Sequence, residues 1–285
     1  MPARIATHAA VAELTRRYNY QPRKSLGQNF LTDPRVAEKI AAAARITPDD
    51  CVIEIGPGLG GLTEALSENA AAVLAVEVDK RLIDILKEIF AGNSRVEIIQ
   101  GDILKMDVGA LMLERGWRTA KLAANLPYYI TTPVLMSLLE SRCPLSVITV
   151  MVQKEVATRL CAKPGGKDYG ALSLAAAYYA DVTLTAIVPR NCFYPRPHVD
   201  SAVVTLELTG PKAEPDDEEL LFKCVRAAFG QRRKTLLNCL RAREWINKGR
   251  EELLNIIKGC GFDGDIRGEA ISLEGFIRLA RKLKD

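Results

Sequence analysis

The residues best suited to chemistry form a glycine-rich turn. Glu54-Ile-Gly56-Pro-Gly58-Leu-Gly60-Gly61 follows a short apolar run and precedes a helical pattern. Glycine is needed where a backbone turns tightly or approaches a ligand without a Cβ in the way. A turn that binds a dinucleotide phosphate is expected to read G-x-G-x-x-G. This turn reads G-x-G-x-G behind a carboxylate, so it favours a positively charged ligand. A tight strand-to-helix turn without a ligand is the alternative.

Two more acidic residues follow predicted strands. Glu77 ends the apolar run 73–77, and Asp102 follows the run 96–99. A carboxylate at such a strand end can accept hydrogen bonds from both hydroxyls of a ribose, and Asp102 can accept one from an adenine amino group. An ordinary surface acid is the alternative for Glu77. Together with the turn, these acids indicate a site for an adenosine that carries a cationic group.

A fourth strand ends in Asn125-Leu126-Pro127-Tyr128-Tyr129. With the glycine turn, this N-L-P-Y sequence resembles S-adenosylmethionine-dependent methyltransferases that modify exocyclic amino groups. Adenine N6 is a poor nucleophile, and hydrogen bonds to the Asn125 side-chain oxygen and the Leu126 carbonyl would pull it toward sp³ geometry. Tyr128 can stack on the extruded base, and Pro127 stiffens the turn. A Pro-aromatic turn used for packing is the alternative.

Further segments narrow the resemblance to the KsgA-type ribosomal RNA adenine dimethyltransferases. These segments are 24–31, 193–201, 229–238 and 267–272, and the similarity extends over residues 24–280. The resemblance implies that S-adenosylmethionine is the methyl donor and that Phe193 forms the second face of the target-base pocket, beside the catalytic residues Asn125, Leu126, Pro127 and Tyr128. It also implies a set of cofactor-binding residues: Gln28, Asn29, Leu31, Gly56, Gly58, Gly60, Glu77, Asp102 and Asn125.

Basic residues gather late in the chain. Between Lys223 and Arg243 there are seven basic residues and no acidic ones. A solvated helix face is expected to mix both signs, whereas this charge density suits phosphates. We therefore expect Arg232, Arg233 and Lys234 to bind RNA. Pairing with other parts of the fold is the alternative for some of the basic residues, such as Arg226.

Alternating apolar and helical segments predict the scaffold. Five short apolar runs, 51–55, 73–77, 96–99, 122–125 and 147–151, are separated by helical patterns. This order is typical of βαβ units and a buried parallel sheet. Two later runs, 182–188 and 202–208, predict a terminal hairpin. Asp33 before Pro34 predicts the start of a helix. We expect a doubly wound, Rossmann-like α/β methyltransferase sheet, mostly parallel, with one antiparallel strand near its end.

Composition shifts divide the chain. The acidic, proline-containing stretch 209–219 has no apolar periodicity, and helical patterns follow it. We expect a basic N-terminal extension over 1–23, a methyltransferase domain over 24–210 and a small all-helical RNA-binding domain over 211–285. Apolar residues form 48% and charged residues 26% of the 285 residues. These values exclude disordered and collagen-like chains.

Composition also limits the chemistry and the location. Seven scattered cysteines without a C-x-x-C pair favour reduced thiols. Two histidines without neighbouring ligands favour no metal site. No apolar stretch is long enough for a membrane span, and no signal peptide is recognised. We therefore expect a cytoplasmic protein without metal or membrane contact, acting as a monomer.

The expected activity is dimethylation of N6 on two adjacent adenosines in the 3′-terminal hairpin loop of 16S ribosomal RNA. The substrate would be the 30S subunit or its precursor, with a role in rRNA processing and late 30S biogenesis. One alternative is an antibiotic-resistance methyltransferase that acts on large-subunit ribosomal RNA. The other is a mainly non-catalytic RNA-binding factor for ribosome assembly.

Overall fold

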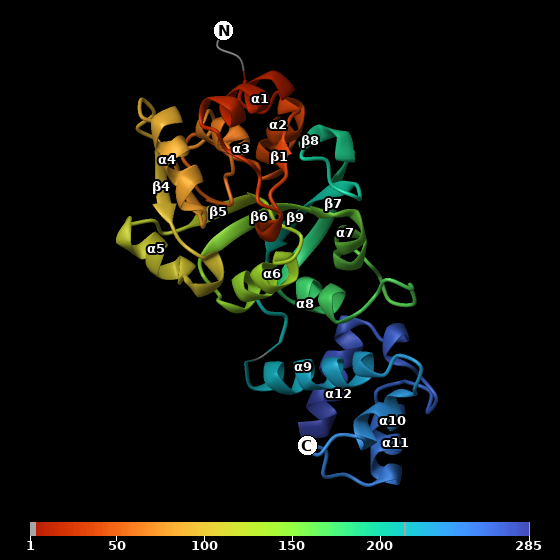
Figure 1. The fold of residues 1–285 in the computed structure, drawn as a ribbon. Helices are drawn as coiled ribbons and strands as arrows, with labels where there is room; N and C mark the ends of the chain where they lie inside the picture. Colours follow the sequence, from red (N-terminus) through yellow and green to blue (C-terminus); the bar gives the residue numbers. More distant parts are fainter. Residues whose placement is uncertain (1–3, 214, 285) are drawn as a thin grey trace. The chain divides into compact units, whose positions relative to one another are not determined.

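The fold consists of two units that draw on different stretches of the chain. A computed structural model describes residues 4–213 and 215–284 (Figure 1). The first unit comprises residues 1–157 and 182–208, and the second comprises residues 158–181 and 209–285. After Leu208 the rest of the chain belongs to the second unit. This boundary lies next to the acidic, proline-containing stretch 209–219.

A seven-stranded sheet forms the centre of the first unit. Its strand order is β4-β3-β2-β5-β6-β9-β7. β2 pairs in parallel with both β3 and β5, β3 pairs in parallel with β4, and β5 pairs in parallel with β6. β9 runs antiparallel to β6, with Val150 opposite Val204. The strands are β2 (Cys51–Ile55), β3 (Ala72–Glu77), β4 (Val96–Gln100), β5 (Ala120–Asn125), β6 (Leu145–Gln153), β7 (Ala180–Val188) and β9 (Ser201–Leu208).

This topology confirms the predicted doubly wound sheet with an antiparallel strand near its end. The chain builds outward from β2 to β4 and then returns to β5 on the other side of β2. The strand order therefore reverses between β2 and β5. Ligands of open α/β sheets bind in the crevice at the carboxyl ends of the strands beside such a reversal.

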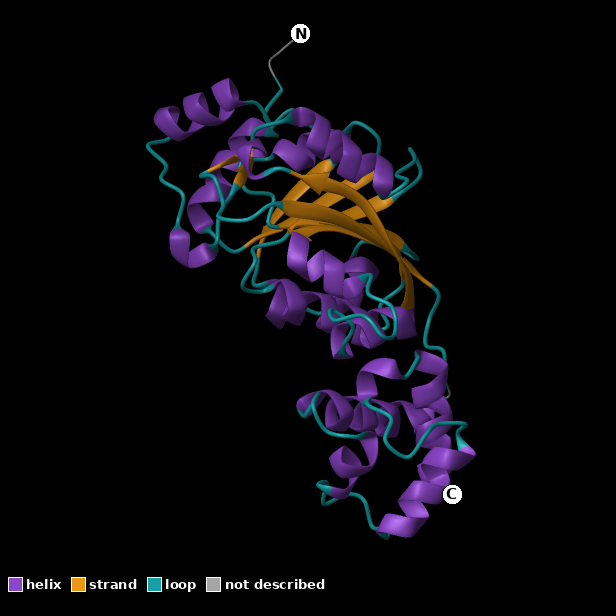
Figure 2. Cartoon of the chain, turned by 90° about the vertical axis from the view of Figure 1, so that its right-hand side faces the viewer, coloured by secondary structure: helices purple, strands orange, loops and turns teal. Residues whose placement is uncertain are grey.

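Helices cover both faces of the sheet (Figure 2). The helices of the first unit are α1 (His8–Arg17), α2 (Pro34–Ala43), α3 (Gly61–Ser67), α4 (Lys80–Ile89), α5 (Val108–Glu114) and α6 (Thr131–Glu140). The predicted start of α2 is confirmed, since the Asp33 carboxylate accepts a hydrogen bond from the Arg35 N–H at 3.0 Å. Such a cap stabilises a helix by about 1 kcal/mol.

One core lies between the sheet and the helices α2 and α3. Ile40 and Leu66 pack there against strand residues that include Val52 and Met151, and all four are buried. Burying a side chain of this size contributes about 1.5–3 kcal/mol. This packing fixes α3, and with it the glycine turn, against the carboxyl ends of the strands.

A second, two-stranded sheet joins segments far apart in the sequence. β1 (Phe30–Leu31) runs antiparallel to β8 (Phe193–Tyr194), with Leu31 opposite Phe193. The Thr32 N–H also donates to the Cys192 carbonyl at 2.8 Å. The sequence segment 24–31 therefore lies beside the segment 193–201.

The N-terminal segment is an integral part of the first unit. Val11 and Tyr20 are buried and pack against Leu82 and Leu86 of α4. An ion pair of 2.5 Å between Arg17 and Glu88 adds a link to α4. The described part of the expected extension is therefore packed onto the domain.

The second unit is helical. Its core includes the buried side chains Leu253 and Phe276. Residues 158–181 join it because the rings of Tyr178 and Tyr179 pack on Phe222, with centroids 5.2 and 6.2 Å apart. Its helices are α8 (Ala171–Tyr179), α9 (Pro215–Gly230), α10 (Leu236–Arg241), α11 (Arg250–Gly259) and α12 (Leu273–Lys284), while α7 (Lys154–Leu160) crosses the border between the units.

Candidate functional site

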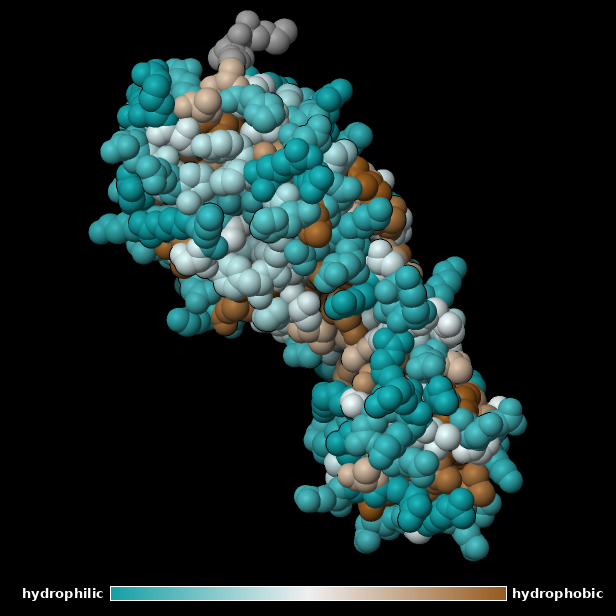
Figure 3. All heavy atoms as spheres, turned by 45° about the vertical axis from the view of Figure 1, so that its right-hand side comes forward, coloured by the Kyte–Doolittle hydropathy of each residue, from teal (hydrophilic) through white to brown (hydrophobic). Residues whose placement is uncertain are grey.

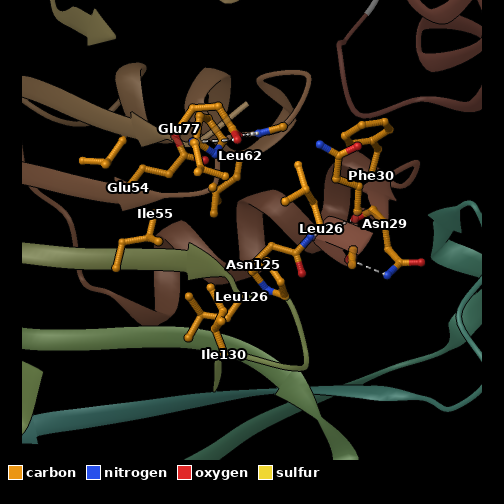
Figure 4. Close-up of a pocket in the computed structure, with 18 of the residues that line it drawn as sticks. Leu26, Asn29, Phe30, Glu54, Ile55, Leu62, Glu77, Asn125, Leu126 and Ile130 are labelled. Atoms are coloured by element: carbon orange, nitrogen blue, oxygen red, sulfur yellow. Dashed lines mark hydrogen bonds between the residues drawn. The ribbon is translucent and has the colours of Figure 1, made fainter. Parts of the chain in front are cut away.

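A cavity of about 360 Å³ opens in the first unit at the carboxyl ends of β2, β3 and β5. This volume is within the range of sites for small molecules and cofactors. Side chains from these strand ends converge on it (Figure 4). Of the catalytic and cofactor-binding residues predicted from the sequence, Gly60 and Phe193 are outside its lining. Those that line it are Gln28, Asn29, Leu31, Gly56, Gly58, Glu77, Asp102, Asn125, Leu126, Pro127 and Tyr128.

Two glycines of the turn are required by close packing. Gly58 has a φ of +61°, and a Cβ there would lie 2.9 Å from a ring carbon of Phe30. Gly60 has a φ of +90°, and a Cβ there would lie 2.6 Å from a ring carbon of Phe90. Real Cβ atoms do not approach carbon so closely, and positive φ is costly for residues other than glycine. Gly60 therefore serves the packing of α3, while Gly58 lets Phe30 reach the cavity.

Glu77 is buried and held in place by the backbone. Its carboxylate accepts hydrogen bonds from the N–H groups of Val78 and Asp79 at 2.9 Å and of Gly58 at 3.3 Å. Burial raises the pKa of Glu77, and these three bonds oppose that rise. An ionised carboxylate has about four acceptor sites. Glu77 therefore keeps capacity for one more donor, such as a ribose hydroxyl.

Asp102 stands at the rim of the cavity. It caps the short 3-10 helix η2 (Ile103–Lys105) by accepting from the Leu104 N–H at 3.2 Å. Its side chain is 39% exposed and lies 3.4 Å from the Lys105 ammonium. The exposed carboxylate is accessible to a donor from a ligand in the cavity.

Gln28 belongs to a hydrogen-bond network. Its Oε1 accepts from the Tyr20 hydroxyl and from the Arg23 N–H, both at 2.7 Å. Its Nε2 donates to the buried carboxylate of Asp79 at 3.3 Å, and the Tyr20 hydroxyl also contacts that carboxylate at 2.9 Å. The amide of Gln28 thus ties the lining loop to the start of α4.

Asn125 joins the end of β5 to the loop that contains Asn29. Its Nδ2 donates to the Asn29 carbonyl at 3.0 Å. Its Oδ1 remains the group that can accept from a ligand. Asn125 and Leu126 lie at the end of β5 beside this loop (Figure 4).

Tyr128 is anchored through its hydroxyl, which lies 2.8 Å from the Ser201 hydroxyl. Burial raises the pKa of Tyr128, so the phenol stays neutral at physiological pH. This contact joins the N-L-P-Y turn to the end of the 193–201 segment. Phe193 itself is 3% exposed and packs with Leu31 in the core of the first unit. Its predicted contact with a target base stays a prediction.

Several residues that line the cavity were not predicted from the sequence. Ile5 and Val11 come from the N-terminal segment, whose basic composition gave no signal of a role in a site. Val78, Leu104 and Tyr129 also line it, with 49, 40 and 58% of their surface exposed. The signal available in the sequence for Val78 and Leu104 was their position one and two residues after the acidic residues Glu77 and Asp102.

Glu54 is the most unusual residue of the lining. It is 1% exposed, and neither of its carboxyl oxygens has a hydrogen-bond partner among the described residues. Its pKa is raised to about 8, chiefly by burial; the Thr63 hydroxyl opposes this rise and the charge of Glu77 adds to it. An unpaired buried carboxylate is costly. A cation in the cavity would supply the missing partner.

The predicted RNA-binding residues lie between α9 and α10 in the second unit, all three exposed. Arg232 donates to the Lys167 carbonyl at 3.0 Å and lies 3.8 Å from Glu269, so it also supports the fold. Arg233 and Lys234 present their charge to solvent. Hydrophilic side chains also cover much of the visible face of this unit (Figure 3).

Two negative findings concern the described part of the chain. Within residues 4–213 and 215–284, no group of three or more His, Cys, Asp or Glu side chains could hold a metal ion. In the same ranges, no helix has the length and apolar character needed to cross a membrane.

Comparisons with known proteins show similarity over most of the chain. The family model described as ribosomal RNA adenine dimethylase matches residues 19–257. The ribosomal RNA small subunit methyltransferase A of Lachnoclostridium phytofermentans is 51% identical, with 94% of this chain and 93% of that protein covered. The protein of the same name from Clostridioides difficile is 46% identical, with 97% of this chain and 96% of that protein covered.

Two solved structures resemble most of the chain. The dimethyladenosine transferase from Plasmodium falciparum has a TM-score of 0.73 and 27% identity, covering 87% of this chain and 95% of that one. The 23S rRNA methyltransferase ErmE has a TM-score of 0.70 and 26% identity, covering 90% of this chain and all of that one. The family-model match and the sequence identity to these relatives each establish the family of this chain. The chain belongs to the ribosomal RNA adenine dimethylase family.

Proposed function

We propose that this protein transfers methyl groups from S-adenosylmethionine to N6 of adenosines in small-subunit ribosomal RNA. The observation that carries the proposal is the orientation of Asn125, whose amide nitrogen is tied to the Asn29 carbonyl while its oxygen is left for a donor in the cavity. An adenine amine has two N–H donors. We infer that one bonds to Asn125 Oδ1 and the other to the Leu126 carbonyl.

The residues of the cavity fit S-adenosylmethionine. Glu77 has acceptor capacity for the ribose, and Asp102 has an exposed carboxylate for the adenine amine. Glu54 is a buried acid whose carboxyl oxygens have no hydrogen-bond partner among the residues that the structure describes. Gln28, Asn29, Leu31 and the glycine turn would complete the cofactor site. When bound, the cofactor supplies a methyl group on a positively charged sulfur.

The remaining catalysis is positioning. Asn125 and Leu126 would hold the target amine with its lone pair facing the methyl group, and Pro127 would keep their backbone rigid. Tyr128 would stack on the target base while Ser201 holds its hydroxyl, and Phe193 would support the base from the other side. The new N–C bond would form as the methyl–sulfur bond breaks, which would leave a neutral thioether, and the proton lost from N6 would pass to solvent.

The substrate proposal follows the named relatives. Relatives between 41 and 51% identical are named ribosomal RNA small subunit methyltransferase A. We infer dimethylation of two adjacent adenosines near the 3′ end of 16S ribosomal RNA, within the 30S subunit or its precursor. We also infer that the protein is a cytoplasmic monomer, acts late in 30S biogenesis, and uses Arg232, Arg233 and Lys234 to bind the RNA. ErmE gives the large-subunit alternative a structural counterpart, but at lower identity.

The test is transfer of labelled methyl groups to 30S particles that lack these modifications, with the product nucleosides identified by mass. We expect N6,N6-dimethyladenosine at two adjacent positions, and no transfer to naked large-subunit RNA. The Asn125→Ala variant should lose at least 100-fold in rate, on the order of a lost positioning contact. Particle binding without any methyl transfer would refute the proposal and favour an assembly factor.

A further inference from the structure

Tyr129 is an exposed aromatic side chain for which the proposed chemistry has no use. It lines the cavity with 58% of its surface exposed. The preceding residue, Tyr128, is half-buried and bonded to Ser201. The two adjacent tyrosines are therefore placed differently, one anchored in the turn and one at the mouth of the cavity.

The ring of Tyr129 rests on a glycine. Gly27 has a φ of +60°, and a Cβ there would lie 3.3 and 3.4 Å from the ring atoms Cδ1 and Cε1 of Tyr129. It would also lie 3.3 Å from Cβ of Pro127. The absence of a side chain at Gly27 thus makes room for the ring. Because the ring packs against Gly27 and 58% of the Tyr129 surface is exposed, the ring offers an apolar surface to solvent.

Lys24 begins the short helix that ends at Gly27. The 3-10 helix η1 (Lys24–Leu26) ends at Gly27, whose N–H donates to the Lys24 carbonyl at 3.0 Å. The Lys24 side chain is exposed. An aromatic ring and a basic side chain can together bind one nucleotide of a single strand, the ring stacking on the base and the cation binding the phosphate.

The position of Tyr129 in the sequence favours RNA over the cofactor as its ligand. The exposed apolar residues Val78 and Leu104 follow Glu77 and Asp102, at the part of the cavity assigned to the adenosine of the cofactor. Tyr129 instead follows Asn125 by four residues, a span of at most about 14 Å. It therefore belongs to the same turn as Asn125 and Leu126, the residues expected to bind the target amine.

We propose that Tyr129 stacks on the unpaired base next to the adenosine held by Asn125, and that Lys24 binds the adjoining phosphate. This inference rests on the proposed function. A substrate with two adjacent target adenosines supplies such a neighbouring base. Stacking there holds the strand while the first adenosine occupies the cavity.

The test compares Tyr129→Leu, which keeps apolar volume without an aromatic face, with the matched control Tyr129→Phe. The substrate is 30S particles lacking the modifications. We expect Tyr129→Leu to raise KM for particles on the order of tenfold, as expected for a lost base-aromatic stack. Affinity for S-adenosylmethionine should stay at the wild-type value, and Tyr129→Phe should keep the wild-type KM. Lys24→Gln should lower the salt dependence of particle binding by about one unit of log–log slope.

A second measurement detects the stack directly. A short single-stranded RNA carries 2-aminopurine next to the target adenosine, and its fluorescence falls when the base stacks. We expect quenching by wild type and Tyr129→Phe but not by Tyr129→Leu. Equal KM values and equal quenching for Tyr129→Leu and wild type, with methylation intact, would overturn the stacking role alone. Absence of methylation by wild type would instead overturn the proposed function.

Discussion

The buried carboxyl of Glu54 should make the affinity for S-adenosylmethionine depend on pH. This buried carboxyl has a pKa raised to about 8, so the free protein holds it mostly protonated at pH 7. A cationic ligand favours the ionised form. Binding must therefore first remove a proton, which costs one tenfold factor in affinity for each pH unit below the pKa. We expect the dissociation constant of S-adenosylmethionine to fall nearly tenfold from pH 6 to pH 7.

The assay is isothermal titration of the wild type and Glu54→Gln with S-adenosylmethionine at both pH values. Glu54→Gln cannot ionise, so the part of the pH dependence that belongs to Glu54 should vanish. Titrations of the wild type in buffers of different ionisation enthalpy should show about one proton released per ligand bound. An equal pH dependence for the two proteins, with no proton release, would refute the reasoning.

The same group predicts how the stability of the free protein changes with pH. The ordinary pKa of glutamate is 4.5, and the folded value is about 8. The folded state therefore keeps a proton that the unfolded state loses between these values. This contribution to stability is complete below pH 4.5 and is lost as pH rises toward 8. The measurement is urea unfolding of wild type and Glu54→Gln between pH 5 and pH 7. For each pH unit, the unfolding equilibrium constant of wild type should rise by a factor about ten times larger than that of Glu54→Gln.

Three further predictions concern packing and RNA binding. Gly60→Ala should lower the free energy of unfolding by about 1–3 kcal/mol in urea titration, because the new Cβ would meet Phe90. The double substitution Arg233→Ala/Lys234→Ala should weaken particle binding and reduce its log–log salt slope by about 1.5, with unchanged thermal stability. Arg232→Ala should in addition destabilise the fold by about 1 kcal/mol, since its bond to the Lys167 carbonyl is lost, and a calorimetric scan separates the two effects.

The sheet could be predicted because its signal is local. Each parallel strand is a short apolar run, and a run such as Cys51–Ile55 is buried on both faces and bounded by turn residues. The start of α2 was equally local, since Asp33 and Pro34 are adjacent. Local patterns of this kind also located the ends of the strands, and therefore most of the residues that line the cavity.

Contacts between distant segments had no such signal. β1 and β8 have two residues each, too few for any periodicity, and they pair across most of the first unit's sequence. Val11 looks like an ordinary apolar residue of a basic helix, yet it forms part of the cavity wall. Such roles depend on which surfaces meet in three dimensions, and the sequence of one segment does not contain that information.

The acidic residues of the site differ most in the number of hydrogen bonds that their carboxylates already accept from the protein. The sequence does not show this number. Glu54 and Glu77 are both buried glutamates beside the same turn. Glu77 accepts three backbone N–H groups, so its charge is supported and its geometry fixed before any ligand arrives. Within the described part of the chain, Glu54 has no such partner. Glu77 is therefore suited to accepting hydrogen bonds from the neutral hydroxyls of a ribose, and Glu54 is suited to binding a positively charged group.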